Sequence, residues 1–187
     1  MNETDKELVA MVLAGRTEAF EPLVTPYRGP VLALAYRLTR DREVAREVAQ
    51  EAFLKAFRSL GRFDVSRPFR NWLFQIAANE ARDRLRGRAR EQAAVRDGGA
   101  GGTVAAADPE AGHDRRELRA GLMRLLEALS PREREVVVLR DLEELDIRET
   151  SRVLGCSAVA VRVHLSKARR KLADLVRRDF PHLEEGR

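Results

Sequence analysis

Basic residues gather near the C-terminal end of the chain, in the stretch GCSAVAVRVHLSKARRKL at residues 155–172. Between residues 162 and 178 there are seven lysines and arginines and a single acid, Asp174. The preceding stretch, residues 132–149, has the opposite balance, with four arginines and seven acids. Cations collected on one helix bind phosphate groups, because the contact releases counterions condensed on a polyanion. The pattern therefore predicts one surface that attracts a polyanion beside one that repels it.

Other reactive residue types are present, but their spacing does not predict catalysis or metal binding. His113, His164 and His182 do not combine with Cys156 in a metal-ligand spacing. The lone cysteine cannot form an internal disulfide, and a redox role for it stays open. The GGAGG segment follows no predicted strand and lacks the Lys-Ser/Thr pair of a phosphate-binding loop. We therefore expect no enzyme activity, no metal, no cofactor and no small-molecule substrate.

The composition favours a helical protein that meets a polyanion. Charged residues make up 35% of the 187 residues and aromatic residues 5%, which is typical of helical proteins with a large polar surface. The formal charge is +5, and only four of the 35 basic residues are lysines. A GC-rich genome would also produce an excess of arginine, so the placement of the cations carries more weight than their number.

The sequence shows no sign of secretion or membrane insertion. Its first residues, MNETDKELVAMVLAG, are acidic and lack the basic-then-apolar order of a signal peptide. No apolar run approaches the ~20 residues needed to span a bilayer. We expect a cytoplasmic protein that is not embedded in a membrane.

The chain divides into two helical blocks around a stretch of different composition. Residues 96–114, RDGGAGGTVAAADPEAGHD, are rich in Gly, Ala and Asp and have no periodic apolar face. Such a stretch cannot bury enough surface to offset its ordering entropy, which predicts a flexible linker. We therefore expect an all-α protein with a helical domain at 1–92, a flexible linker at 93–114 and a second helical domain at 115–187.

Glycines and prolines divide the first block into helices. A helix at residues 4–14 is expected to stop at Gly15. Pro26 and Pro30 then predict a break near Gly29.

Two longer helices follow in this block. The segment DREVAREVAQEAFLKAFRSLG predicts a helix that ends at Gly61, with an inner stripe of Ala45, Val48, Ala49, Ala52, Ala56, Phe57 and Leu60. After the loop RFDVSRP, Pro68 opens a helix that runs to about Arg88. Its buried side is expected to contain Phe69, Trp72, Leu73, Ile76 and Leu85. Trp72 is thus interpreted as a core residue rather than as a platform for stacking bases.

The second block has three helix starts. Ser130 is followed by Pro131 and by an acid at the third helical position, which is a capping box, and Asp146 begins a second start of the same kind. Gly155 occupies a C-cap position, and Ser157 caps the last helix. Helix, short turn and helix in this order predict a helix-turn-helix domain.

The last helix has one apolar and one polar side. Its expected buried stripe consists of Val161, Leu165, Ala168, Leu172 and Leu175. The remaining surface exposes Arg162, His164, Ser166, Lys167, Arg169, Arg170 and Lys171. Within a helix-turn-helix, a cationic face of this kind predicts a DNA-recognition helix.

Two long stretches resemble conserved regions of one family, in the family's order. AREVAQEAFLKAFRSLGRFDVSRPFRNWLFQIAANEARDRLR resembles the second conserved region of extracytoplasmic-function (group IV) sigma factors, and LSPREREVVVLRDLEELDIRETSRVLGCSAVAVRVHLSKARRKL resembles their fourth. The resemblance implies a dissociable initiation subunit of bacterial RNA polymerase. Such a subunit binds the minus-thirty-five and minus-ten promoter elements and helps to melt the latter, while the polymerase performs the chemistry.

The resemblance assigns polymerase binding to the EVAQEAFLKAF helix, which in this family docks on the clamp of the largest polymerase subunit. On the side away from the predicted core lie Glu47, Gln50, Glu51, Leu54, Lys55 and Arg58. Leu54 is a large apolar residue among polar ones, which favours a role as an anchor surrounded by polar contacts.

By the same resemblance, the loop before the Trp72 helix and the outer side of that helix read and open the minus-ten element. One base is captured at positions that match Phe63, Asp64, Val65, Ser66 and Asn79. The outer side of the helix is expected to carry Asn71, Gln75, Ala78, Asn79, Arg82 and Arg86. Flipping a base costs a few kcal/mol, which stacking and hydrogen bonds in the pocket must offset.

For the upstream element the matching positions are Arg140, Arg162, Val163, Ser166 and Lys167. The sequence departs from the family here, because Val163 replaces a small polar residue and His164 an arginine, and Val159-Ala160 stands where Gly-Thr is common. Valine contacts a thymine methyl group but cannot hydrogen-bond a base edge. We therefore expect a different or weaker preference for the upstream sequence.

Two other classes of protein remain open at this point. One is a transcriptional regulator with a helix-turn-helix output block and a ligand- or partner-sensing N-terminal block. The other is a helical adaptor or antagonist that binds only proteins. A membrane-anchored anti-sigma factor is a further expected partner, since many members of the family have one. The sequence identifies neither that antagonist nor the inducing signal.

Overall fold

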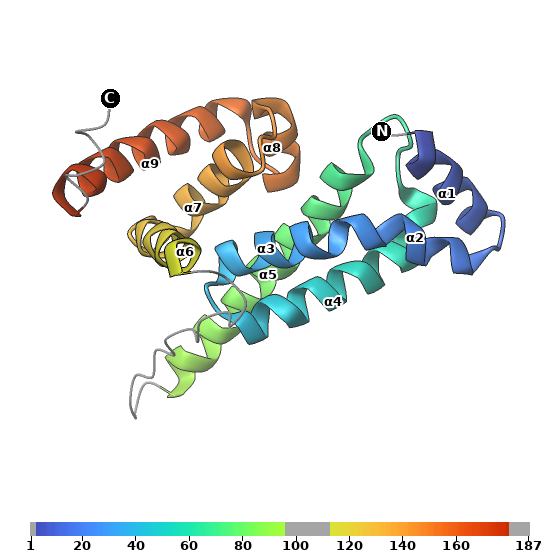
Figure 1. Ribbon diagram of the computed structural model, residues 1–187, viewed down its shortest axis with the longest axis horizontal. Coiled ribbons are helices and arrows are strands. Elements are labelled where there is room, and N and C mark those ends of the chain that lie inside the picture. The colour runs from blue at the N-terminus through green and yellow to red at the C-terminus, as the bar shows by residue number, and fades with distance from the viewer. Residues whose placement is uncertain (1–2, 96–112, 180–187) are drawn as a thin grey trace. The chain divides into compact units, whose positions relative to one another are not determined.

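The computed structural model describes residues 3–95 and 113–179. All the regular secondary structure in these two ranges is helical (Figure 1). The chain divides into two compact units, one containing α1 to α5 and the other α6 to α9. Most of the predicted linker, residues 96–112, lies outside the described residues. Helix α5 continues to Val95 and α6 begins at His113, so the predicted domain boundaries at 92 and 115 fall inside helices.

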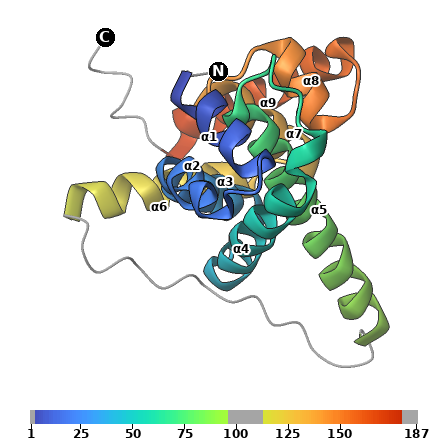
Figure 2. The ribbon, with the colours of Figure 1, turned by 90° about the vertical axis from the view of Figure 1, so that its right-hand side faces the viewer.

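The first unit is a helical bundle preceded by short helices. In chain order it contains α1 (Glu3–Leu13), the 3₁₀ turn η1 (Thr17–Ala19), α2 (Phe20–Val24), the 3₁₀ turn η2 (Thr25–Tyr27), α3 (Arg28–Thr39), α4 (Arg42–Ser59), the 3₁₀ turn η3 (Leu60–Arg62) and α5 (Phe69–Val95). Helices α3, α4 and α5 run side by side and contain most of the unit's core (Figure 1). The C-terminal part of α5 extends beyond α3 and α4 (Figure 2).

Small residues allow α4 to approach its neighbours closely. Its buried side is formed by Val44, Ala45, Val48, Ala49, Ala52 and Ala56. Helix α5 supplies larger side chains to the same core, with Phe69, Leu73, Phe74, Ala77, Ala78 and Ala81 all buried. Fully burying one such leucine or phenylalanine contributes about 1.5–3 kcal/mol, so this interface sets the rotation of both helices about their axes.

Several details of the predicted helices were wrong. The break before α3 lies at η2 rather than near Gly29, because Pro26 fits the start of the 3₁₀ turn and Pro30 fits the first turn of α3. Helix α4 passes into η3 instead of ending at Gly61. Phe57 is 41% exposed rather than buried.

The buried side of α5 is also rotated from the predicted one. Ala78 is 1% exposed and belongs to the core, not to the outer side. Trp72, Ile76 and Leu85 are half-buried at the edge of the stripe, and Phe74 takes the deep position. Because the apolar stripe of a helix is about 100° wide, the helix can rotate this far about its axis while the same sequence pattern still fits.

Ion pairs join α4 to α5 along their length. Buried Glu80 binds Lys55 and lies 3.6 Å from Arg84, which also pairs with Glu47 at 2.7 Å. Near the start of α4, Asp41 accepts hydrogen bonds from Arg88 and from the backbone N–H groups of residues 44 and 43, and these bonds, that from Arg88 most of all, lower its pKa. Polar contacts thus hold the outer edge of the interface whose centre is apolar.

The second unit contains α6 (His113–Glu127), α7 (Pro131–Val137), the π-helical turn η4 (Val138–Leu142), α8 (Ile147–Leu154) and α9 (Ala158–Asp179). Its core includes Leu126, Leu129, Val136, Val137, Val138, Leu139, Leu145, Val153, Leu154, Val161, Leu165 and Ala168. Within the described residues of both units, no helix has an apolar stretch that could cross a membrane.

The predicted caps of this unit are confirmed. Ser130 and Glu133 form the reciprocal hydrogen bonds of a capping box at the start of α7, and Asp146 caps α8. Gly155 has φ of 59°, a left-handed conformation that costs glycine little, and the Ser157 hydroxyl accepts from the N–H of Ala160 at 3.1 Å. These local bonds fix the α8-turn-α9 geometry of a helix-turn-helix.

Two ion pairs connect α9 to the acidic segment before α8. Lys171 donates to Glu133 at 2.7 Å, and Arg169 donates to both carboxylate oxygens of Asp141, at 2.5 and 3.1 Å. The lysine is the main cause of a lowered pKa at Glu133, and burial only partly opposes it.

Replacing Glu133 by glutamine should destabilise this unit at neutral pH. The variant loses a charge-assisted bond worth about 1 kcal/mol, so amides of α7 and α9 should exchange hydrogen about fivefold faster at pH 7. Because the folded pKa is depressed, this stabilisation is present above the ordinary glutamate value of 4.5 and disappears as the pH falls through the lowered folded value.

The matched control is Asp174→Asn, which breaks a pair with Arg177 in which both side chains are exposed. Such pairs contribute little, so this variant should exchange like the parent chain. A Glu133→Gln effect of the same size at pH 7 and at pH 3 would contradict the assignment to an ion pair.

Candidate nucleic-acid and protein interfaces

Helix α9 presents a continuous outward face opposite its buried stripe. Val161, Leu165 and Ala168 are buried, and counting about 100° per residue places Val159, Val163, Ser166 and Arg170 on the far side. Arg162 and Lys167 flank this line on either side. A shallow depression on the face is lined by Arg162, Val163, Ser166, Lys167 and Arg170. The structure thus brings together four of the five residues predicted to bind the upstream element and adds Arg170.

The cations of α9 fall into two groups. Arg169 and Lys171 lie nearer the buried stripe, where Asp141 and Glu133 neutralise them. Arg162, Lys167 and Arg170 lie on the outward face and have no ion pair with any residue that the structure describes. The sequence had not separated these groups, since all five cations lie within ten residues of one another. The outward cations are therefore the ones available to phosphate.

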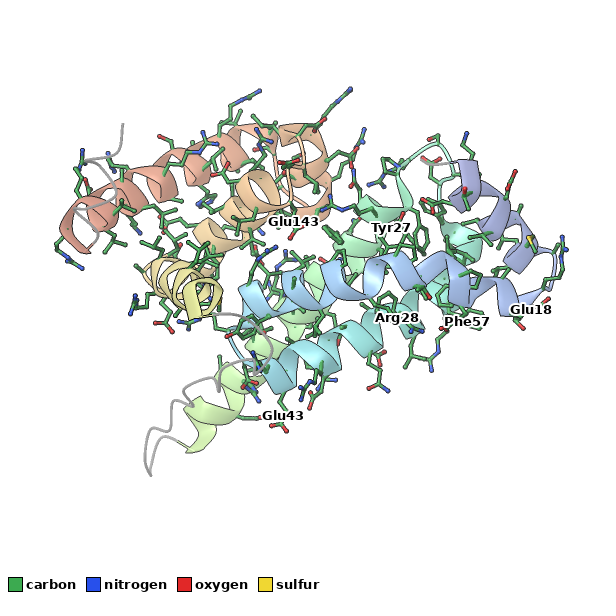
Figure 3. The ribbon with its side chains drawn as sticks, in the orientation of Figure 1. Glu18, Tyr27, Arg28, Glu43, Phe57 and Glu143 are labelled. Carbon is green, nitrogen blue, oxygen red and sulfur yellow. The ribbon has the colours of Figure 1, made fainter. Side chains whose placement is uncertain are left out.

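Arg140 is used within the fold. It lies in η4, half-buried, and its Nη1 donates to the backbone carbonyl of Leu145 at 2.5 Å. The segment that it closes includes Glu144, whose φ of 58° is left-handed, and buried Glu143 (Figure 3). If Arg140 bound a phosphate, the same guanidinium would also have to keep its hydrogen bond to the Leu145 carbonyl.

The loop between α4 and α5 places its polar residues outward over an aromatic cluster. Phe63 is 7% exposed, with its ring 4.8 Å from Trp72 and 5.5 Å from Phe69, so the ring supports the loop from below instead of lining an open base pocket. Asp64, Val65 and Ser66 are exposed. The Asp64 carboxylate accepts from the backbone N–H and the hydroxyl of Ser66, at 3.0 and 2.7 Å, which makes the turn compact.

The outer side of α5 continues from this loop. Asn71, Gln75, Asn79, Arg82 and Arg86 recur at steps of four, four, three and four and share one face. Asn79 is exposed, and its Oδ1 accepts a hydrogen bond from Arg82 at 3.0 Å. Arg86 lies 3.8 Å from Asp83 in an exposed pair. Because Ala78 lies in the core, the predicted residues that remain on this face are amides and arginines.

The outward side of α4 has an apolar centre. Leu54 is 42% exposed and Phe57, one helical turn further and labelled in Figure 3, is 41% exposed. The ring of Phe57 packs edge-to-face against Phe20 of α2, with centroids 5.0 Å apart. The apolar stripe of this helix predicts Phe57 in the core, and that prediction is wrong. Its spacing of three from Leu54 was the signal that it belongs to the same exposed patch.

Polar residues surround this apolar centre. Gln50, Glu51 and Arg58 complete the predicted set on α4, with Glu51 half-buried and the other two exposed. Glu47 and Lys55 are exposed as predicted but already pair with Arg84 and Glu80 of α5. Any partner of this surface must compete with those pairs or add to them.

The remaining reactive residues form no site in the described part of the chain. Cys156 is a free, half-buried thiol in the turn between α8 and α9. Within residues 3–95 and 113–179, no three side chains of His, Cys, Asp or Glu gather in an arrangement that could hold a metal ion.

Two family models match the two units. Residues 23–91 match Sigma-70 region 2, and residues 119–172 match Sigma-70, region 4. The first range contains the α4 and α5 surfaces, and the second contains the helix-turn-helix.

Full-length relatives and solved structures agree with this assignment. The chain is 35% identical to the RNA polymerase sigma-H factor of Pseudomonas aeruginosa, over 89% of this chain and 91% of that one. It is 32% identical to the ECF RNA polymerase sigma-E factor of Escherichia coli, over 94% and 97%. The solved structure of CnrH with the cytosolic domain of CnrY matches with a TM-score of 0.69 and 31% identity, over 95% and 99%. RpoE of Bartonella quintana, solved with the anti-sigma factor NepR, has a TM-score of 0.72 over 86% and 98% at 21% identity, which shows the shared fold.

The resemblance seen in the sequence is therefore confirmed over nearly the full length of the relatives. The two units correspond to the promoter-recognising regions 2 and 4, and proteins of this family are not enzymes. The chain belongs to the extracytoplasmic-function group of RNA polymerase sigma factors, which direct the polymerase to promoters.

Proposed function

We propose that three outward surfaces divide the work of this sigma factor between core polymerase and the two promoter elements. The observation that carries the proposal is the outward face of α9, where three cations that pair with none of the described residues line one side of a helix-turn-helix. Phosphates of the upstream element would bind Arg162, Lys167 and Arg170, and base edges would meet Val163 and Ser166.

The α5 surface and the loop before it would act on the downstream element. Exposed Asp64, Val65 and Ser66 stand at the start of a polar face that continues through Asn79 to Arg86. An unpaired base held between the loop and Asn79 would be read by hydrogen bonds, while Arg82 and Arg86 supply positive charge for the backbone. Phe63 would keep the loop in place from within the core.

The α4 surface would bind core polymerase at the clamp of its largest subunit. Leu54 and Phe57 form an apolar centre with polar residues around it, which is the usual arrangement of a binding hot spot. We also infer that an antagonist protein covers one of these surfaces, because the structural relatives CnrH and RpoE were solved with partner proteins, in the second case an anti-sigma factor. Because core polymerase and promoter DNA would be its partners, we propose that the active protein works in the cytoplasm.

The deciding experiment is transcription in vitro with purified core polymerase and fragmented genomic DNA. Addition of this chain should produce transcripts with defined start sites, and omission should leave only non-specific initiation. A transcriptional regulator would require an additional sigma factor to give such starts, and an adaptor or antagonist would give none. Failure to produce specific starts with a competent core enzyme would refute the proposal.

Leu54→Asp should weaken binding to core polymerase about 30-fold or more, because a charge in the centre of a hot spot loses the apolar contact and is desolvated without a partner. Surface plasmon resonance with immobilised core enzyme measures this affinity. Leu32→Asp on α3, where the leucine is 39% exposed, is the matched control and should bind normally. Equal affinities of the two variants would remove Leu54 from the interface.

Asn79→Ala should slow promoter opening about tenfold, because a flipped base loses one of the hydrogen bonds that offset the cost of unstacking. Permanganate reactivity of unpaired thymines measures the opening rate. A template with a premelted bubble should restore normal transcription, since the energy of strand separation is then already supplied. A defect that persists on the premelted template would show that Asn79 acts elsewhere.

A further inference from the structure

Two valines are exposed on the cationic face of α9. Val159 is 65% exposed and Val163 is 45% exposed, and they lie four residues apart, one helical turn along the same side. Single exposed aliphatic residues are common and require no explanation. Here two adjoining ones occupy the centre of a face whose other members are Arg162, Ser166, Lys167 and Arg170.

The orientation of this pair is set by the fold. Because Val161, Leu165 and Ala168 are buried, the two valines point almost directly away from the core. Val159 lies in the first turn of α9, just after the cap Ser157, and Val163 lies in the second. In a helix-turn-helix the N-terminal residues of the second helix contact base edges in the major groove.

The charges around the valines indicate which kind of partner molecule can contact this face. Arg162 and Lys167 flank Val163 on both sides, Val159 lies one turn before it and Arg170 continues the line, so the partner must combine phosphate-like charge with small apolar groups. The major groove of DNA does so, because the thymine C5-methyl group is the apolar group that its base edges present there.

We propose that Val159 and Val163 read thymine methyl groups in the upstream promoter element. The inference rests on the proposed function of α9 and specifies its substrate. Valine neither donates nor accepts a hydrogen bond, so these positions select thymine by its methyl group and discriminate little among the hydrogen-bonding patterns of the other bases.

The test uses the holoenzyme formed from the full chain and core polymerase. Duplexes are first selected from a library with a randomised upstream element, and each thymine of the selected element is then replaced by uracil, which lacks only the methyl group. At one or two positions the substitution should weaken binding about fourfold, the equivalent of about 0.8 kcal/mol for one buried methyl group. In Val159→Ala or Val163→Ala, the corresponding uracil substitution should have no further effect.

Leu118→Ala is the matched control, since this leucine is 76% exposed but lies on α6 and does not line the depression of α9, and the variant should keep full sensitivity to uracil. Two results with the unaltered chain would overturn the inference: selection of an element without thymine, or equal affinity for the thymine and uracil duplexes. Neither result depends on whether a valine variant folds. Uracil sensitivity that persists in both valine variants would also overturn it. Failure to select any duplex would instead count against the proposed function of α9.

Discussion

Burial of one apolar stripe on each long helix determines which side chains are left to meet a partner. In α9 the stripe of Val161, Leu165 and Ala168 turns outward the two valines and three cations that form no ion pair within residues 3–95 and 113–179. In α4 the buried alanines bring the helix close to α3 and α5 and leave Leu54 and Phe57 exposed. A rotation of either helix by a few tens of degrees would bury part of its interface, so core packing positions the functional surfaces.

Ion pairs divide the charged residues into those that stabilise the fold and those that remain for binding. The acidic stretch before α8 does not merely repel phosphate, because Glu133 and Asp141 neutralise two cations of α9. In the first unit, Glu80, Glu47 and Asp41 do the same for Lys55, Arg84 and Arg88. The net charge of +5 therefore understates how strongly positive the outward face of α9 is.

Separate units with separate surfaces suit a protein that binds several partners and catalyses nothing. Joining two DNA contacts in one chain would raise the affinity for a promoter above that of either contact alone. The surface of α4 that we propose binds polymerase and the polar face of α5 belong to one packed core, so polymerase binding would fix where the residues proposed to open the strands lie. The α9 face belongs to the other unit and is built on its own caps and core.

The sequence alone determined the helical class, the caps at Ser130, Asp146 and Ser157, the left-handed turn at Gly155 and the family, because these depend on local spacing and on residue types in order. Tertiary structure decided the rest. Apolar periodicity could not tell that Phe57 is exposed, Ala78 is buried and Phe63 lies beneath its loop, since residues at the edge of a stripe are assigned by the shape of the neighbouring helix. Nor could it separate Arg169 and Lys171 from Arg162 and Lys167, because their acidic partners lie 28 and 38 residues away in the chain and meet them only when α9 packs on α7 and the turn that follows it.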